Sequence, residues 1–158
     1  DGQLNMMQLN MTSLVGLTWH LLPNLKKNKE AYILNVSSIA AYQAIPNFSI
    51  YAASKSFVLS FSRGLRHELS KTSVKVSCLC PGPTESSFVE RARMMELQET
   101  AKKFNMSSEE VAKIAVIGMF KGKAEIVPGL LNKVSKQAVN YLPKDIVESI
   151  IGRFYRKD

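Results

Sequence analysis

A tyrosine and a lysine four residues apart, Tyr51 and Lys55, are the side chains of this sequence best suited to acid–base chemistry. On a helix, residues four apart lie on the same face, so both side chains can reach one cleft. A free phenol has a pKa of about 10, and a neighbouring cation stabilises the phenolate and lowers that pKa. The spacing therefore predicts a proton-transfer pair in which Lys55 brings the pKa of Tyr51 toward neutrality.

A third polar side chain, Ser38, precedes Tyr51 by thirteen residues and ends the strand-like run AYILNVSS. Its hydroxyl can hydrogen-bond the same substrate oxygen as Tyr51 and polarise it. Together these groups suit proton transfer to or from a carbonyl or alcohol oxygen. Taken alone, the Y-x-x-x-K pattern is common, and a half-buried tyrosine beside a lysine that reaches solvent fits it as well.

Helical and strand-like segments alternate along the chain and must position these side chains. Apolar residues recur at helical spacing in five segments, at residues 4–25, 49–69, 107–120, 130–142 and 144–155. Runs rich in Val, Ile and Leu predict three strands, at residues 31–38, 74–80 and 124–129. Ser107 and Glu110 have the spacing of a capping box at the start of the third helix. The polar stretch 84–105 has a composition that allows one or two short helices.

The alternation predicts one α/β domain, residues 1–158, with a parallel sheet, because right-handed crossovers place helices on the sheet faces. In such folds ligands bind at the carboxyl ends of the strands. Two segments meet this condition, Ser37 with Ser38 after the first strand and residues 81–87 after the second. The functional residues are expected there.

Composition and charge restrict the class of protein. With 158 residues, 46% hydrophobic and 22% charged, the chain has the composition of a globular domain. It has no apolar run of about 20 residues, and its first residues do not have the layout of a signal peptide, so we expect a cytoplasmic location. The net charge of +8 is dispersed and accompanies no DNA or RNA module, which predicts no nucleic-acid partner.

Other reactive side chains have simpler interpretations. Cys78 and Cys80 lie two apart in a strand, without the spacing of a redox pair or a zinc site, so we expect two buried thiols and no metal. The amphipathic segment 144–155 is basic at its end and fits either a membrane surface or the protein itself. Its Asp145 and Glu148 favour packing on the protein.

Four features together resemble the short-chain dehydrogenase/reductase family. NVSS ends a strand, Tyr51 follows thirteen residues after Ser38, Lys55 follows four later, and CLCPG ends the next strand. The runs ILNVSSIAAY, YAASKSFVLSFS and LCPGPT are similar to the bacterial branch of carbonyl and 3-oxoacyl reductases. The resemblance covers nearly the whole chain, most securely residues 10–88, and implies the C-terminal part of a Rossmann-type, doubly wound parallel sheet with flanking helices.

The resemblance also implies catalytic roles. Ser38, rather than Ser37, takes the place of the catalytic serine, and Tyr51 is the acid in reduction and the base in oxidation. Lys55 holds the ribose hydroxyls of a nicotinamide cofactor and lowers the tyrosine pKa. Asn10 anchors the water of a proton relay. The implied activity is NAD(P)-dependent reduction of a carbonyl or oxidation of a secondary alcohol.

The implied cofactor is NAD or NADP, and the resemblance places Pro81, Gly82 and Thr84 along the nicotinamide. Ser86 stands where the family usually has a threonine that contacts the carboxamide. The glycine-rich turn that holds the pyrophosphate is absent, as is the charge that selects NAD or NADP. We therefore expect the chain to be the C-terminal portion of a longer enzyme, inactive by itself.

Two further expectations concern partners. By resemblance, the helices at 4–25 and 49–69 pair across a subunit boundary, which implies a homodimer or homotetramer acting on a small-molecule substrate. The alternative is a non-catalytic dinucleotide sensor or scaffold of the same fold. The presence of Ser38, Tyr51 and Lys55 together favours the enzyme.

Overall fold

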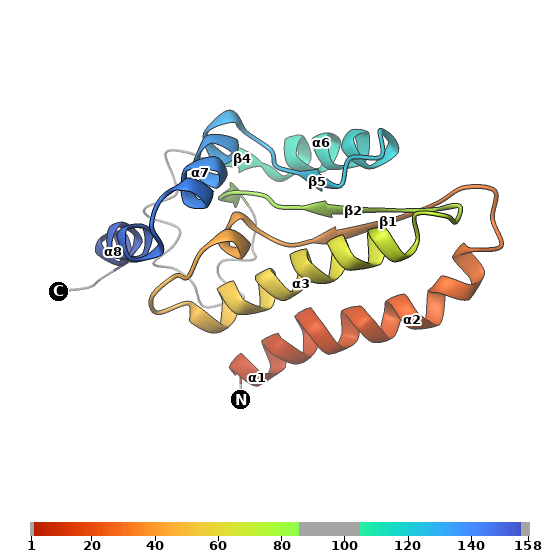
Figure 1. The fold of residues 1–158 in the computed structure, drawn as a ribbon, viewed down its shortest axis with the longest axis horizontal. Helices are drawn as coiled ribbons and strands as arrows, with labels where there is room; N and C mark the ends of the chain where they lie inside the picture. The colour runs from red at the N-terminus through yellow and green to blue at the C-terminus, as the bar shows by residue number, and fades with distance from the viewer. Residues whose placement is uncertain (1, 86–104, 156–158) are drawn as a thin grey trace.

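A parallel sheet forms the centre of the computed structural model, which describes residues 2–85 and 105–155 (Figure 1). Its strands lie in the order β1 (Ala31–Val36), β2 (Val74–Leu79) and β5 (Glu125–Ile126), all parallel. The register pairs Ala31 with Val74 and Val36 with Leu79. The predicted α/β fold with a parallel sheet is confirmed.

Helices cover both faces of this sheet (Figure 1). One face carries the N-terminal helix and the helix with the Y-x-x-x-K pattern: α1 (Gly2–Met7), η1 (Gln8–Thr12), α2 (Ser13–Leu25) and α3 (Ser49–Glu68). The other face carries α6 (Ser108–Phe120). Ser107 caps α6 by accepting a hydrogen bond from the Glu110 N–H at 3.2 Å, as its spacing predicts.

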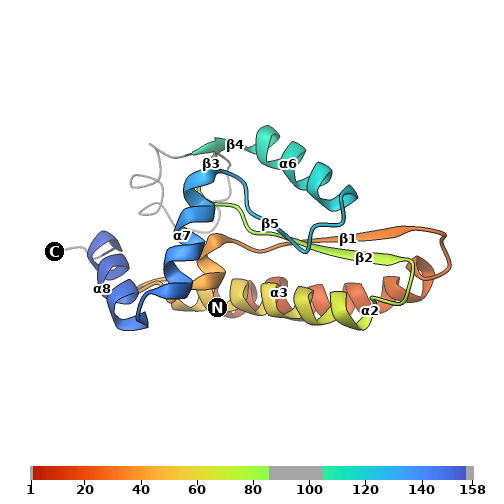
Figure 2. The ribbon, with the colours of Figure 1, turned by 45° about the horizontal axis from the view of Figure 1, so that its top comes forward.

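The remaining elements gather at the carboxyl ends of the strands (Figure 2). They are η2 (Ile39–Tyr42), β3 (Thr84–Glu85) paired with β4 (Met106–Ser107), α7 (Leu130–Tyr141) and α8 (Lys144–Tyr155). α8 packs on the protein, since Val147 is buried and Ile151 lies against the cluster of Ala40, Ile45 and Ala52. No helix in the two described ranges is both long and apolar enough to cross a bilayer.

The first and third predicted strands extend too far. β1 ends at Val36 rather than at residue 38, because Ser38 turns the backbone and caps the short 3-10 helix η2. β5 spans only Glu125 and Ile126 of the predicted 124–129, because a proline at residue 128 cannot donate to a strand ladder. Both corrections shorten a strand at the edge where the functional residues were expected.

The central strand β2 contributes buried residues to several hydrophobic clusters of the core. Val76, Cys78 and Cys80 are almost fully buried, and both cysteines are free thiols, as predicted. Arg66 of α3 donates to the carbonyl oxygens of Val76, within β2, and of Gly122, before β5, at 2.6 and 2.9 Å. These contacts fix α3, and with it Tyr51 and Lys55, against the strands.

Candidate active site

The structure places Ser38 and Ser37 on different sides of the backbone at the end of β1. The Ser38 Oγ accepts a hydrogen bond from the Ala40 N–H at 3.1 Å and lies 3.5 Å from the carbonyl oxygen of Pro81. The Ser37 hydroxyl instead donates to the carbonyl oxygen of Lys55 at 2.7 Å and is buried. Only Ser38 therefore presents its hydroxyl to the strand-end region.

Tyr51 lies in the first turn of α3, with its side chain hydrogen-bonded to that of Ser38. Burial raises the pKa of Tyr51 above its ordinary value, and the hydrogen bond with Ser38 only partly offsets that effect. The sequence predicts a lowered pKa, so the net direction here is the opposite. The reason is that removing a phenolate from water costs more than this hydrogen bond returns.

Lys55 follows Tyr51 by one helical turn and is buried. Its Nζ donates to the carbonyl oxygen of Val36 at 3.2 Å and lies 5.8 Å from the centre of the Tyr51 ring. Burial lowers the pKa of the Lys55 ammonium, although the thiols of Cys78 and Cys80 oppose this shift. The predicted juxtaposition of Ser38, Tyr51 and Lys55 is thus present in the fold.

Asn10 lies in η1, a π-helical turn that interrupts the N-terminal helix. Its Nδ2 donates to the Ser54 hydroxyl at 3.0 Å, and that hydroxyl donates to the carbonyl oxygen of Tyr51 at 2.8 Å. Such turns are frequent at functional sites. The turn thus brings Asn10 beside the segment of α3 that carries Tyr51.

The segment after β2 lies against Ser38 and α7. The carbonyl oxygen of Pro81 accepts a hydrogen bond from the Ile39 N–H at 3.0 Å, and Thr84 Oγ1 donates to the carbonyl oxygen of Gly82 at 3.0 Å. A Cβ at Gly82 would lie 2.5 Å from the Asn132 amide nitrogen, so any larger residue would displace that amide. Pro81, Gly82 and Thr84 therefore share one edge with Ser38.

Sequence reasoning missed two features of this edge. Asn132 of α7 is one, because only the folded chain places it at Gly82. The other is Glu125, a carboxylate that accepts hydrogen bonds from Tyr42, Arg63 and Lys136. Glu125 lies within a predicted strand, and nothing in the neighbouring sequence indicates that it would accept these three hydrogen bonds.

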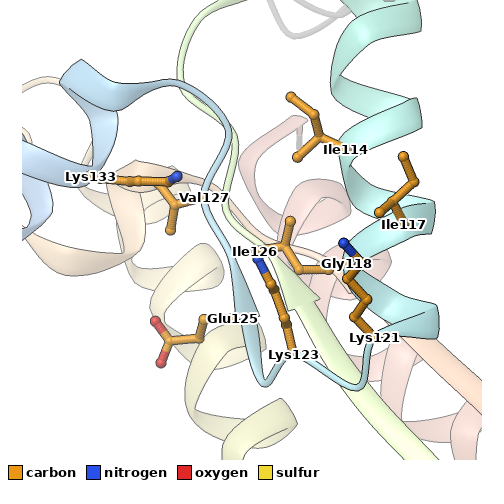
Figure 3. A pocket seen from close by; sticks show the side chains of 9 residues that line it. All are labelled: Ile114, Ile117, Gly118, Lys121, Lys123, Glu125, Ile126, Val127 and Lys133. Carbon is orange, nitrogen blue, oxygen red and sulfur yellow. The ribbon is translucent and has the colours of Figure 1, made fainter.

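Ser86 falls outside the described residues. A cavity of about 200 Å³ between α6 and β5 has none of the predicted site residues in its lining (Figure 3). Among residues 2–85 and 105–155, no group of three His, Cys, Asp or Glu side chains could hold a metal ion.

Comparison with known proteins places this chain in a family. The family model described as short chain dehydrogenase matches residues 3–97, which include Asn10, Ser38, Tyr51 and Lys55. The chain belongs to the short-chain dehydrogenase family. This confirms the resemblance that the sequence motifs indicate.

Similar proteins include named short-chain dehydrogenases. A sulfoacetaldehyde reductase from Chromohalobacter salexigens is 45% identical over 84 residues, covering 52% of this chain and 33% of that protein. The human 17-beta-hydroxysteroid dehydrogenase 13 is 30% identical over 131 residues, covering 79% of this chain and 41% of that protein. The chain thus spans half or less of the length of these two relatives.

Solved structures of short-chain dehydrogenases share the fold. One from Burkholderia cenocepacia, in complex with NADP, has a TM-score of 0.77 at 22% identity, over 94% of this chain and 58% of that one. One from Burkholderia phymatum, in complex with NAD, has a TM-score of 0.75 at 20% identity, over 83% and 54%. The Rossmann-type architecture of this short-chain dehydrogenase is thereby confirmed.

Proposed function

We propose that the protein is an NAD(P)-dependent oxidoreductase that reduces a carbonyl or oxidises a secondary alcohol. The observation that carries the proposal is the hydrogen-bonded pair of Ser38 and Tyr51, with the buried ammonium of Lys55 5.8 Å from the tyrosine ring. The group lies at the carboxyl edge of a parallel sheet, where ligands bind in this class of fold.

Tyr51 is proposed as the acid and base of the reaction. Because burial raises its pKa, the phenol is protonated at neutral pH and can donate its proton to a carbonyl oxygen during reduction. In the oxidation direction the same oxygen accepts the proton of the alcohol. Ser38, within hydrogen-bonding reach of Tyr51, holds the substrate oxygen and stabilises the charge that develops on it.

The residues at this edge fit a nicotinamide dinucleotide, NAD or NADP, which when bound supplies or accepts a hydride. An ammonium has three N–H donors, so Lys55 can serve ribose hydroxyls while it donates to the Val36 carbonyl. Pro81, Gly82 and Thr84 are proposed to line the nicotinamide, and Ser86 to contact its carboxamide. Asn10 is proposed to hold a water molecule of the proton relay.

The test is the full-length enzyme with Tyr51→Phe, which keeps the ring and removes the transferable proton. With a panel of ketones and both cofactors, we expect turnover to fall by about 10²- to 10⁴-fold. Tyr32→Phe is the matched control, because Tyr32 lies in β1 and contacts Phe120 far from Ser38. Unchanged turnover in the Tyr51→Phe variant would contradict the proposed role of Tyr51 as acid and base. Dinucleotide binding by a wild type without turnover would favour the non-catalytic alternative.

A homodimer or homotetramer through α1, α2 and α3 is part of the proposal. Large apolar side chains face solvent on the N-terminal helix, including Leu9 and Trp19, and Phe57 stacks on Phe61 along α3 with ring centres 6.0 Å apart. Monomeric proteins rarely expose such extended apolar surface. Light scattering of the full-length protein should show an oligomer that Trp19→Ser weakens, and a monomeric wild type would contradict this.

A cytoplasmic location stays a prediction.

A further inference from the structure

One carboxylate, Glu125 of β5, connects four elements around the candidate site. Its Oε2 accepts hydrogen bonds from the Tyr42 hydroxyl at 2.8 Å and from the Lys136 ammonium at 2.5 Å. Its Oε1 accepts one from Arg63 Nε at 2.6 Å. These donors belong to η2, α7 and α3, so the side chain links all three helices to the sheet.

The contacts of Glu125 are enclosed, unlike ordinary surface ion pairs. The Glu125 side chain is 17% exposed and that of Lys136 20%, whereas Arg63 is 53% exposed and contributes less. Figure 3 shows the Glu125 side chain on the opposite side of β5 from Gly118 and Lys121. Burial raises the pKa of Glu125, but its three donors more than offset this, so the carboxylate stays charged at neutral pH.

Two of the donors lead directly to residues of the site. Tyr42 is the last residue of η2, the helix that Ser38 caps, so the Tyr42 hydrogen bond fixes the segment that orients Ser38. Lys136 lies one helical turn after Asn132, whose amide lies against Gly82. The Lys136 ion pair therefore fixes the helix that contacts the proposed cofactor segment.

We propose that Glu125 is a positioning residue that holds Ser38 in place through Tyr42 and η2, and Gly82 in place through Lys136 and α7. The inference rests on the proposed function. The contacts of Glu125 form two branches. One leads through Tyr42 to Ser38, which is proposed to act on the substrate oxygen, and the other leads through Lys136 to Gly82, which is proposed to line the cofactor. Each branch has a second anchor, the Ser56 hydroxyl bonded to the Ala41 carbonyl for η2 and the buried Val139 for α7. Removing one donor should therefore shift a branch without unfolding it.

The experiment compares three variants of the full-length enzyme by steady-state kinetics. Tyr42→Phe should lower kcat by about tenfold with the cofactor KM unchanged, because small displacements of catalytic groups cost up to about 10²-fold. Lys136→Met should raise the cofactor KM by about tenfold and leave kcat nearly unchanged. Glu125→Gln should show both changes. Glu30→Gln is the matched control, since Glu30 also pairs with a lysine at 2.5 Å, at the opposite end of the strands.

Three outcomes would overturn the inference. The first is a Glu125→Gln variant with wild-type kcat and KM. The second is an equal loss of both parameters in all three variants together with a parallel loss of thermal stability, which would make the cluster purely structural. The third applies if the wild type binds a dinucleotide but shows no turnover, so that the proposed function fails and kinetics cannot be used. In that case the dinucleotide affinity is measured by titration calorimetry, and equal affinities of the wild type and Lys136→Met would overturn the inference.

Discussion

At the scale of single residues, the burial of Tyr51 determines which protonation state the site starts from. The side chain is hydrogen-bonded to Ser38, yet the net shift of its pKa is upward. The protonated phenol is therefore the resting form at neutral pH, the form that reduction needs. The ammonium of Lys55, itself buried with a lowered pKa, does not reverse this in the protein without a ligand.

We predict that Tyr51 of the cofactor-free, full-length protein ionises only above its ordinary pKa of 10.0. The measurement is a spectrophotometric titration of wild type against Tyr51→Phe, whose difference isolates one phenol. Because the folded-state pKa is raised, the stability that this group contributes is present below the unfolded pKa and is lost as the pH rises through the folded one. If the difference spectrum already changed near neutral pH, burial would not be the dominant effect on the pKa of Tyr51.

The neighbouring serines provide a matched pair. Ser38→Ala should lower turnover by about 10²- to 10³-fold, the usual cost of one oxyanion donor. Ser37→Ala should keep most of its turnover and lose about 1 kcal/mol of unfolding free energy, because its buried hydroxyl donates to the Lys55 carbonyl rather than facing the strand-end region. Turnover and chemical denaturation are measured on both variants. A reversed pattern would show that Ser37 faces the substrate.

The residue types in the site were predictable from sequence because their spacing follows helix and strand periodicity. Ser38 ends a strand, and Tyr51 and Lys55 share a helix face, so the fold brings them together. The direction of the Tyr51 pKa was not predictable. It depends on how completely neighbouring segments enclose the ring, which no local pattern records.

At the scale of elements, α6 and β5 approach each other closely because Gly118 has no side chain. A Cβ at Gly118 would lie 2.8 Å from Cδ1 of Ile126, a side chain that is 3% exposed and would have to shift to make room. Gly118→Ala should therefore lower the unfolding free energy by about 1 to 3 kcal/mol, and adding Ile126→Val should recover part of it. Gly64→Ala in α3 is the control, since nothing lies within 4 Å and a gain of about 0.5 to 1 kcal/mol is expected there.

Denaturant titration of the full-length protein measures these variants. If Gly118→Ala left the unfolding free energy unchanged, α6 and β5 could move apart at no cost. The five longer helices were predicted within a few residues because their apolar periodicity is long and regular. The short helices expected within 84–105 fall almost wholly outside the described residues, and Thr84 and Glu85 form the strand β3. The π-helical turn Gln8–Thr12 and the 3-10 helix Ile39–Tyr42 were not predicted, since such short elements depend on contacts made elsewhere in the fold.

At the scale of the whole molecule, the described residues form a layered sheet whose carboxyl edge is bordered by segments far apart in sequence. Tyr42, Arg63, Glu125 and Lys136 meet there across four elements. A parallel sheet was predictable because alternating helices and strands leave few other arrangements. The meeting of these four side chains was not, because it depends on the path of α7 across the strand ends.

The same carboxylate should make the stability of the protein depend on pH. The pKa of Glu125 is held below its ordinary 4.5, so its contribution is present above that value and is lost as the pH falls through the folded-state pKa. Glu125→Gln should lower the unfolding free energy by about 1 to 3 kcal/mol at neutral pH, and the two proteins should converge in acid. Denaturant titrations of both proteins across this pH range measure the difference. Because a glutamine carries no titrating charge, a constant difference at all pH values would mean that packing, rather than the ionised carboxylate, joins the four elements.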